Sequence, residues 1–342
     1  MVTESARNDE HLSQRSIYDE RYLAGLYDRR SAVPVLTAER ELLDGAIDRS
    51  LISHPRAERI SLFDFGYGTG RVINHWLEGH AHSRLAARHE LCVVAYDVSS
   101  VGLRTAMEKL RSCGYRPTGP VVWHPEAARG YVAGAVHKQV AGISITVTFV
   151  HGCEDQSPDV MRELALSANG GERYLVATSW YSGLGHVPGD SLRREYFREL
   201  SELTAPAGEM IVCLSATGDL VEIQPEWSKR RATGETKGFP IERPGDLVYL
   251  TELDQENFYH VFGTELNDYM RAITGSGQHW WIEGVRYPDE EFETQAAEQR
   301  NYRRVRRANL SKRGRIWDAA DYREFHTVAA LRSAIDPLDG SR

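Results

Sequence analysis

Short apolar runs alternate with amphipathic stretches along much of the chain, and this alternation predicts buried strands joined by helices. Four of the runs are rich in β-branched and aromatic residues: residues 60–65, 91–98, 143–152 and 173–179. A further run, at residues 209–214, follows a proline and a glycine. Strands that alternate with helices form parallel sheets covered by helices on both faces, so the pattern predicts an α/β fold.

The pattern is weaker outside these runs. Residues 114–142 are rich in glycine, proline and aromatic residues, which predicts an insertion with one or two short strands. Residues 246–253 resemble a strand, an extended segment then enters a helix at Thr264, and residues 279–285 predict the last strand. Residues 224–244 carry many charges and a poor apolar pattern, which predicts a mobile flap.

Length and composition fit a globular protein with a sizeable core. The chain has 342 residues, of which 41% are hydrophobic, enough for one large domain with additions or for two small domains. Its net charge of −8 does not favour binding to nucleic acid or to an anionic membrane. No signal peptide or apolar run of transmembrane length is evident, so we expect a cytoplasmic protein. The cysteines show no metal-binding spacing, and no metal site is expected.

Candidate ligand-binding residues lie together where the first predicted strand ends, in the sequence I-S-L-F-D-F-G-Y-G-T-G. Gly66, Gly68 and Gly70 stand between that strand and a helix N-terminus, where backbone can approach a nucleotide-like ligand closely. Their spacing differs from the dinucleotide fingerprint G-x-G-x-x-G. Asp64 precedes the first glycine, and a carboxylate at this position suits a ligand with an ammonium group and repels a pyrophosphate.

The pattern D-x-G-x-G-x-G resembles motif I of the class I S-adenosylmethionine (SAM) dependent methyltransferases, and the resemblance extends over roughly residues 18–282. It implies a Rossmann-like, doubly wound, mostly parallel sheet, with SAM as methyl donor and S-adenosylhomocysteine (SAH) as product. The second predicted strand ends at Asp97, where a carboxylate can accept hydrogen bonds from both ribose hydroxyls. The alternative for Asp97 is a surface acid at a strand end.

The resemblance also implies a set of cofactor-binding residues: Tyr18, Tyr22, Asp64, Gly66, Gly68, Gly70, Asp97, Val98, Glu154, Asp155, Ser179 and Trp180. Tyr18 and Tyr22 repeat on one helical face, either in an N-terminal lid over the cofactor or in an amphipathic helix packed on the sheet edge. Asp155, with Glu154 beside it, fits the position that hydrogen-bonds the adenine amino group. Alternatively, these two acids belong to a solvated loop and help the next helix to begin.

The loop after the fourth strand, W-Y-S-G-L-G-H, corresponds to the active-site loop of the family. If the acceptor must lose a proton, His186 is the first candidate base, because an imidazole titrates near pH 6.5. Tyr181 and His260 are the next candidates. His186 can equally be a structural residue that holds the loop. Several aromatic residues are either an acceptor wall or, as we favour, part of the core: Trp180, Tyr181, Tyr259, Trp280 and Trp281.

These observations divide the chain into an N-terminal helical lid at residues 1–55, a methyltransferase domain at 56–285 and a C-terminal extension at 286–342. The extension carries eight basic residues within residues 300–315. This segment is a site for an anionic substrate, RNA or a partner protein, or, as we favour, a solvated helix paired with acids.

The predicted function is methyl transfer to the nitrogen or oxygen of a small molecule. Alternatives that keep the fold are an aminopropyl transferase, a dinucleotide oxidoreductase and a non-catalytic regulator. No nucleic-acid or membrane partner is expected, and a homodimer is compatible with the sequence.

Overall fold

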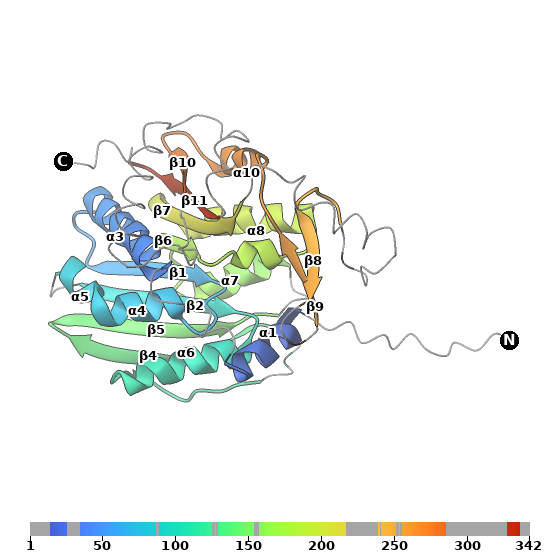
Figure 1. The fold of residues 1–342 in the computed structure, drawn as a ribbon. Helices are drawn as coiled ribbons and strands as arrows, with labels where there is room; N and C mark the ends of the chain where they lie inside the picture. Colours follow the sequence, from blue (N-terminus) through green and yellow to red (C-terminus); the bar gives the residue numbers. More distant parts are fainter. Residues whose placement is uncertain are drawn as a thin grey trace, which may run out of the picture.

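The computed structural model of the chain describes residues 14–25, 35–86, 89–124, 127, 129–153, 157–216, 239, 241–250, 253, 255–284 and 327–335. A nine-stranded sheet crosses the molecule, and a separate two-stranded hairpin lies beyond one of its ends (Figure 1).

Five adjacent strands at the centre of the sheet are parallel. In spatial order they are β7 (Thr204–Ser215), β6 (Tyr174–Ser179), β1 (Arg59–Phe65), β2 (Glu90–Asp97) and β5 (Ile143–His151). Read from β5 and numbered along the chain, these strands have the order 3-2-1-4-5, which is that of a doubly wound sheet. The predicted Rossmann-like fold is therefore confirmed. The order reverses between β1 and β6, so the crevice of such a fold lies beyond the carboxyl ends of these two strands.

Antiparallel strands complete both edges of the sheet. On one side the predicted insertion forms β4 (Tyr131–Val140) and β3 (Arg116–Pro117). On the other side β11 (Thr327–Ser333) lies between β7 and β10 (His279–Gly284) and is antiparallel to both. The sequence pattern predicts β10 but no strand after it, so the assignment of all residues beyond 285 to an extension outside the fold needs correction. β11 is rich in alanine, which has a weak preference for strands, and this explains why it escapes notice.

Helices cover both faces of the sheet (Figure 1). One face carries α3 (Val35–Ser53), α4 (Arg71–Gly79), α5 (Ala81–Arg84) and α6 (Ser100–Ser112). The other face carries α7 (Pro158–Ala168), α8 (Asp190–Leu203) and α10 (Leu266–Ile273). Each face has its own cluster of buried apolar side chains, so the sheet is buried on both sides.

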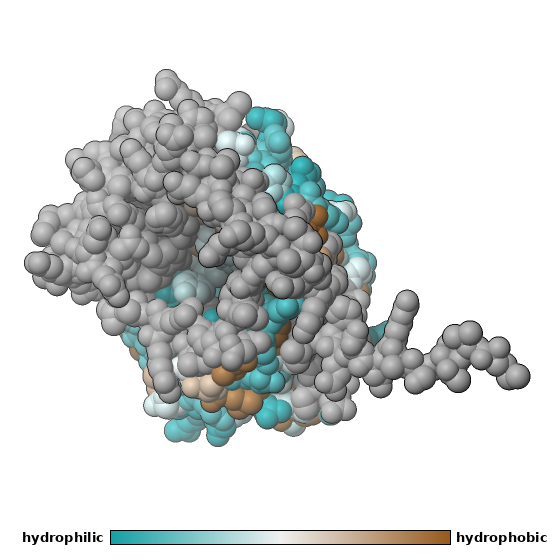
Figure 2. Space-filling view, turned by 45° about the vertical axis from the view of Figure 1, so that its right-hand side comes forward, coloured by the Kyte–Doolittle hydropathy of each residue, from teal (hydrophilic) through white to brown (hydrophobic). Residues whose placement is uncertain are grey.

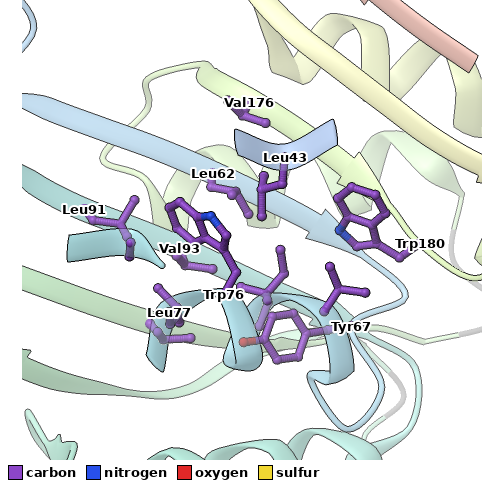
Figure 3. Packing of buried hydrophobic residues seen from close by; sticks show 14 of the residues in the cluster. Leu43, Leu62, Tyr67, Trp76, Leu77, Leu91, Val93, Val176 and Trp180 are labelled. Carbon is purple, nitrogen blue, oxygen red and sulfur yellow. The ribbon is translucent and has the colours of Figure 1, made fainter. Parts of the chain in front are cut away.

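The core under α4 leads directly to the crevice. Figure 3 shows Trp76 of α4 beside Leu62 of β1 and Leu43 of α3, all of them fully buried. The Trp76 indole also donates a hydrogen bond of 2.8 Å to Asp44. Tyr67 and Trp180 lie nearer the carboxyl ends of the strands in the same cluster. Close packing in this layer fixes the positions of the loops that follow β1 and β6.

Two elements stand outside the sheet near the carboxyl ends of the central strands. They are the helix α1 (Gln14–Leu23) and the hairpin of β8 (Asp246–Leu250) with β9 (Glu256–His260). They lie next to each other (Figure 1), and Gln255 donates a hydrogen bond of 2.6 Å to Glu20.

The described surface in Figure 2 is mainly hydrophilic, with small hydrophobic areas. Within the described ranges, none of the helices combines the length and apolar character needed to cross a bilayer.

Candidate cofactor and acceptor site

The glycine turn between β1 and α4 has a backbone shape that explains its sequence. Gly66, Gly68 and Gly70 have φ angles of 74°, 54° and 71°, in the left-handed region that glycine enters without steric cost. The amides of Gly66 and Tyr67 donate hydrogen bonds of 2.9 and 3.0 Å to the carbonyl of Tyr96 in β2. The turn is therefore held against the end of β2.

Asp97 connects the end of β2 to this turn. Its Oδ2 accepts a hydrogen bond of 2.7 Å from the amide of Gly68, and its Oδ1 accepts one of 2.7 Å from the amide of Ser99. The side chain is only 7% exposed, and burial raises the pKa of Asp97 to about 6, although both hydrogen bonds oppose this shift. Each oxygen retains a lone pair that can accept a hydrogen bond from a ribose hydroxyl. This geometry argues against a plain surface acid.

Asp64 lies inside the strand layer beneath the turn. Thr178 of β6 donates a hydrogen bond of 2.7 Å to its Oδ1, so the carboxyl links the two strands that flank the crevice. Burial, followed by the charges of Asp97 and Glu39, holds the pKa of Asp64 well above its usual range. A cationic group of a ligand near this carboxyl would oppose that shift.

Two buried polar atoms at the end of β6 have no hydrogen-bond partner among the described residues. They are Oγ of Ser179 and Nε1 of Trp180, whose indole is 4% exposed. A buried donor without a partner costs free energy, and a ligand in the crevice can relieve that cost. The Trp180 side chain is buried in the core cluster under α4, so its ring face is not an acceptor wall (Figure 3).

The loop after β6 has a strained backbone. Tyr181 and Ser182 have φ angles of 50° and 59°, and a non-glycine residue in this region costs about 1–3 kcal/mol. Tyr181 is 37% exposed, with the Arg71 guanidinium 4.8 Å from its ring centroid. Arg71 also forms an ion pair of 2.7 Å with the buried Glu39. Strain of this kind concentrates at functional sites, which makes the loop a candidate for acceptor contact.

His186 ends the short 3-10 helix η1 (Gly183–His186) in this loop. Its Nδ1 lies 3.0 Å from the carbonyl oxygen of Phe258, which can only accept, so Nδ1 carries the proton and Nε2 presents a lone pair. Burial lowers the pKa of His186 to about 4, with a further contribution from Arg21. The expected titration near pH 6.5 is therefore corrected, because burial disfavours the charged imidazolium.

The helix α1 covers the glycine turn. A Cβ atom on Gly68 would lie 2.7 Å from the Tyr22 hydroxyl, and one on Gly102 would lie 2.9 Å from the Tyr22 ring. Asp19 accepts a hydrogen bond from the Ser99 hydroxyl. Tyr18 meets the His186 ring edge-on, with centroids 5.2 Å apart. α1 thus contacts both the cofactor side and the acceptor side, which is the position that a lid requires.

The neighbouring helix α3, also inside the region predicted as a lid, belongs to the core. Its residues Leu42, Leu43, Ala46 and Ile47 are fully buried in the cluster under α4. Only α1 therefore remains a candidate lid.

His260 does not have the position of a base. It is fully buried, its Nδ1 lies 2.7 Å from Asp246, and its Nε2 lies 3.3 Å from Glu265. Asp246 also pairs with the buried Arg193 at 2.8 Å. Because both ring nitrogens face carboxylates, His260 holds the hairpin β8–β9 on α8 and α10, and its candidacy as a base is corrected.

Other predicted residues lie apart or outside the described chain. Trp280 and Trp281 belong to β10 at the far edge of the sheet, and the indole of Trp281 donates a hydrogen bond of 2.8 Å to Glu283. Trp281 is buried in the core, as favoured from the sequence, whereas Trp280 is only partly buried and packs against the core. Val98 lies half-buried beside Asp97. Glu154, Asp155 and the basic segment 300–315 lie outside the described residues, as does most of the predicted flap at 224–244.

The sequence reasoning missed several residues that complete the site. Arg71 directly follows the last glycine, and this position at the start of a helix could have identified it from the sequence as a site residue. Ser99 follows Asp97 and caps α6 by accepting a hydrogen bond from the amide of Gly102. Thr178 and the Phe258 carbonyl give no signal in the sequence, because their roles depend on contacts between distant elements.

An open doubly wound sheet, with a glycine turn after β1 and a buried acid after β2, defines a Rossmann-like protein whose crevice suits a nucleoside ligand. No family model and no curated protein matches the chain. Among solved structures, it is similar to a SAM-dependent methyltransferase from Clostridium acetobutylicum at 10% identity, covering 92% of this chain and 98% of that chain, with a TM-score of 0.45.

Two further structures are similar. The plantazolicin methyltransferase BpumL in complex with SAH has 13% identity, covers 94% of this chain and 92% of that chain, and gives a TM-score of 0.44. The methyltransferase CcbJ from Streptomyces caelestis has 14% identity, covers 85% and 89%, and gives a TM-score of 0.38. Because these identities and TM-scores are low, the functional proposal rests on the site itself.

Proposed function

We propose that this chain is a class I SAM-dependent methyltransferase that methylates the nitrogen or oxygen of a small molecule. The hydrogen bond between Asp97 and Gly68 is the observation that carries the proposal. It unites the acid expected to bind ribose with the turn expected to approach the cofactor, and both lie at the switch point of the sheet.

The residues present fit the cofactor. Gly66 and Gly68 allow the backbone of the turn to approach the cofactor without a side chain at these two positions, and Asp97 with Val98 receives the ribose. Asp64 lies under the turn as a carboxylate for a cationic group, and the unpartnered Ser179 and Trp180 atoms offer further polar contacts. Glu154 and Asp155 are proposed to receive the adenine. Bound SAM supplies a methyl group that its sulfonium has already activated.

The acceptor is proposed to lie between the glycine turn and the loop after β6. His186 is neutral at pH 7, because its pKa is lowered to about 4, and its Nε2 can accept a proton from the acceptor nitrogen or oxygen. Tyr181 lies at the opening of the same loop and contributes an exposed ring face. α1 closes over both groups and excludes water, which strengthens electrostatic interactions in the site.

Further parts of the proposal come from the sequence. We propose a cytoplasmic protein with a small-molecule acceptor and no nucleic-acid partner, and a homodimer remains compatible with it. The basic segment 300–315 is proposed to pair with acidic residues.

Calorimetric titration with SAH, SAM, decarboxylated SAM and NAD tests the proposal, followed by transfer of a radiolabelled methyl group from SAM to a panel of amines and phenols. SAH and SAM should bind and a methyl acceptor should emerge. Preferred binding of NAD would instead indicate an oxidoreductase, and preferred binding of decarboxylated SAM an aminopropyl transferase. Binding of SAH without any transfer across a broad panel would favour a regulatory role.

A further inference from the structure

Three hydroxyl groups meet behind the strained loop, from elements that are distant in sequence. Tyr259 of β9 donates a hydrogen bond to Oγ of Ser215 at the end of β7. The Ser182 hydroxyl donates a hydrogen bond of 3.3 Å to the same oxygen. In return, the amide of Ser215 donates a hydrogen bond of 2.6 Å to Oγ of Ser182. Ser215 is therefore the centre of a network that joins the loop to β9.

This network forms hydrogen bonds to Ser182 in the strained part of the loop. Ser182 is buried, and its amide donates a further hydrogen bond of 2.9 Å to the carbonyl of Cys213, while its carbonyl accepts one of 2.8 Å from Gly185. Adjacent left-handed residues other than glycine persist only where their surroundings impose that conformation. The contacts made by Ser215 and Tyr259 provide part of that constraint.

The constraint determines where the Tyr181 ring lies. The ring projects from the held turn toward Arg71, the first residue after the glycine turn, and remains partly exposed. The loop also approaches the glycine turn closely, since a Cβ atom on Gly66 would lie 3.6 Å from Cα of Gly183. Tyr181 thus lies beside the place proposed for methyl transfer.

Tyr259 also touches the second acceptor-side residue. Its ring centroid lies 4.7 Å from that of His186, and Phe258, the residue before it, supplies the carbonyl that fixes the His186 tautomer. One stretch of β9 is therefore linked through Ser215 to Ser182, the residue after Tyr181, and contacts His186 through its ring and backbone.

We propose that Ser215 and Tyr259 are positioning residues of the acceptor site: their paired hydroxyls hold the Tyr181–Ser182 turn so that the exposed Tyr181 ring forms one wall against a flat acceptor group. The role of the Tyr181 ring as an acceptor wall rests on the proposed function. The constraint that Ser215 and Tyr259 place on the Tyr181–Ser182 turn does not. Tyr259→Phe separates the two contacts of Tyr259, because it removes the hydroxyl and keeps the ring against His186.

The test is fluorine NMR of the full chain with 3-fluorotyrosine at position 181, in the wild type, Ser215→Ala, Tyr259→Phe and the double variant. We expect one resonance in the wild type and the same displaced or broadened resonance in all three variants. The double variant should show the effect of Ser215→Ala and no more, because the Tyr259 hydroxyl reaches Ser182 only through the Ser215 hydroxyl. Ser61→Ala is the matched control, since Ser61 of β1 is also buried and accepts a hydrogen bond of 3.2 Å from the amide of Leu175. It should leave the resonance unchanged.

A wild-type spectrum in both Ser215→Ala and Tyr259→Phe would overturn the proposal. Titration with SAH separates this result from the proposed function, because all these variants should bind SAH as the wild type does. Failure of the wild type to bind SAH would contradict the proposed methyltransferase function. The fluorine spectra would still show whether Ser215 and Tyr259 hold the Tyr181–Ser182 turn. With an acceptor from the screen, kcat/KM for that acceptor should fall on the order of tenfold to a hundredfold in Tyr259→Phe, with KM for SAM unchanged.

Discussion

At the scale of single residues, the partners of the ring nitrogens distinguish two histidines that look alike in the sequence. One ring nitrogen of His186 donates to a backbone carbonyl and the other has no hydrogen-bond partner among the described residues, whereas both nitrogens of His260 face carboxylates. Only the first arrangement can take a proton from a substrate. The sequence names both residues as candidates, because the difference depends on partners from distant parts of the chain.

His186→Ala should lower turnover about a hundredfold if the imidazole is the base, while SAH affinity stays unchanged. The pKa of about 4 places the loss of activity of the wild type at acid pH, because His186 stays neutral and able to accept a proton down to that value. Turnover measured at saturating SAM, where the titration of Asp97 does not limit cofactor binding, should therefore be flat near neutrality. A saturated wild-type turnover that falls through pH 6.5, or a His186→Asn variant with normal turnover, would remove His186 as the base.

At the scale of elements, the glycine turn and α1 behave as one unit. Gly68→Ala introduces a methyl group 2.7 Å from the Tyr22 hydroxyl and places alanine at a φ of 54°. Gly170→Ala is a matched control, with a φ of 70° and no atom within 4 Å of the added methyl group. Both variants should lose about 1 kcal/mol from backbone strain, measured by denaturant unfolding.

Only Gly68→Ala should also disturb α1 and weaken SAH binding in calorimetry. Adding Tyr22→Phe should restore part of that affinity, because the shortest contact is to the hydroxyl and the ring carbon behind it lies 3.4 Å away. Equal behaviour of Gly68→Ala and Gly170→Ala would show that α1 does not rest on the turn.

The elements also show how far the sequence predicts the fold. The five parallel strands and the glycine turn were predictable, because each strand is a short apolar run that ends in turn residues. β11 was not, because its alanine-rich run pairs with β7, which lies far back in the chain. The local sequence pattern cannot predict the lowered pKa of His186 or the hydrogen bonds between Ser215 and Ser182, because both depend on tertiary contacts.

At the scale of the whole molecule, a buried ion pair ties α3 to the sheet. Arg49 of α3 donates to Glu209 of β7 at 3.1 Å, and Ser333 of β11 donates to the other oxygen of Glu209. Hydrogen bonds to both oxygens offset part of the desolvation of this carboxylate. The contact brings three distant parts of the chain together at the edge where β11 joins the sheet.

Glu209→Ala should lower the free energy of unfolding by about 3–5 kcal/mol, because it leaves the Arg49 guanidinium buried without this partner. Glu172→Ala is the control, since Glu172 is 73% exposed and its ion pair with Arg59 should contribute about 0–1 kcal/mol. Denaturant unfolding followed by circular dichroism measures both. Equal losses in the two variants would mean that the Arg49–Glu209 pair does not hold α3 on the sheet.

The most direct test of the central claim is calorimetric titration of SAH into the wild type, Asp97→Ala and Asp48→Ala, where Asp48 is an acid of α3 that pairs with Arg84. Asp97→Ala should weaken SAH by about 1–3 kcal/mol, the cost of ribose hydroxyls left without a partner, and Asp48→Ala should have no effect. Because the pKa of Asp97 is about 6 and ribose hydroxyls prefer the ionised carboxylate, wild-type affinity should fall as pH drops below that value. Unchanged SAH affinity in Asp97→Ala, or no SAH binding by the wild type, would contradict the account.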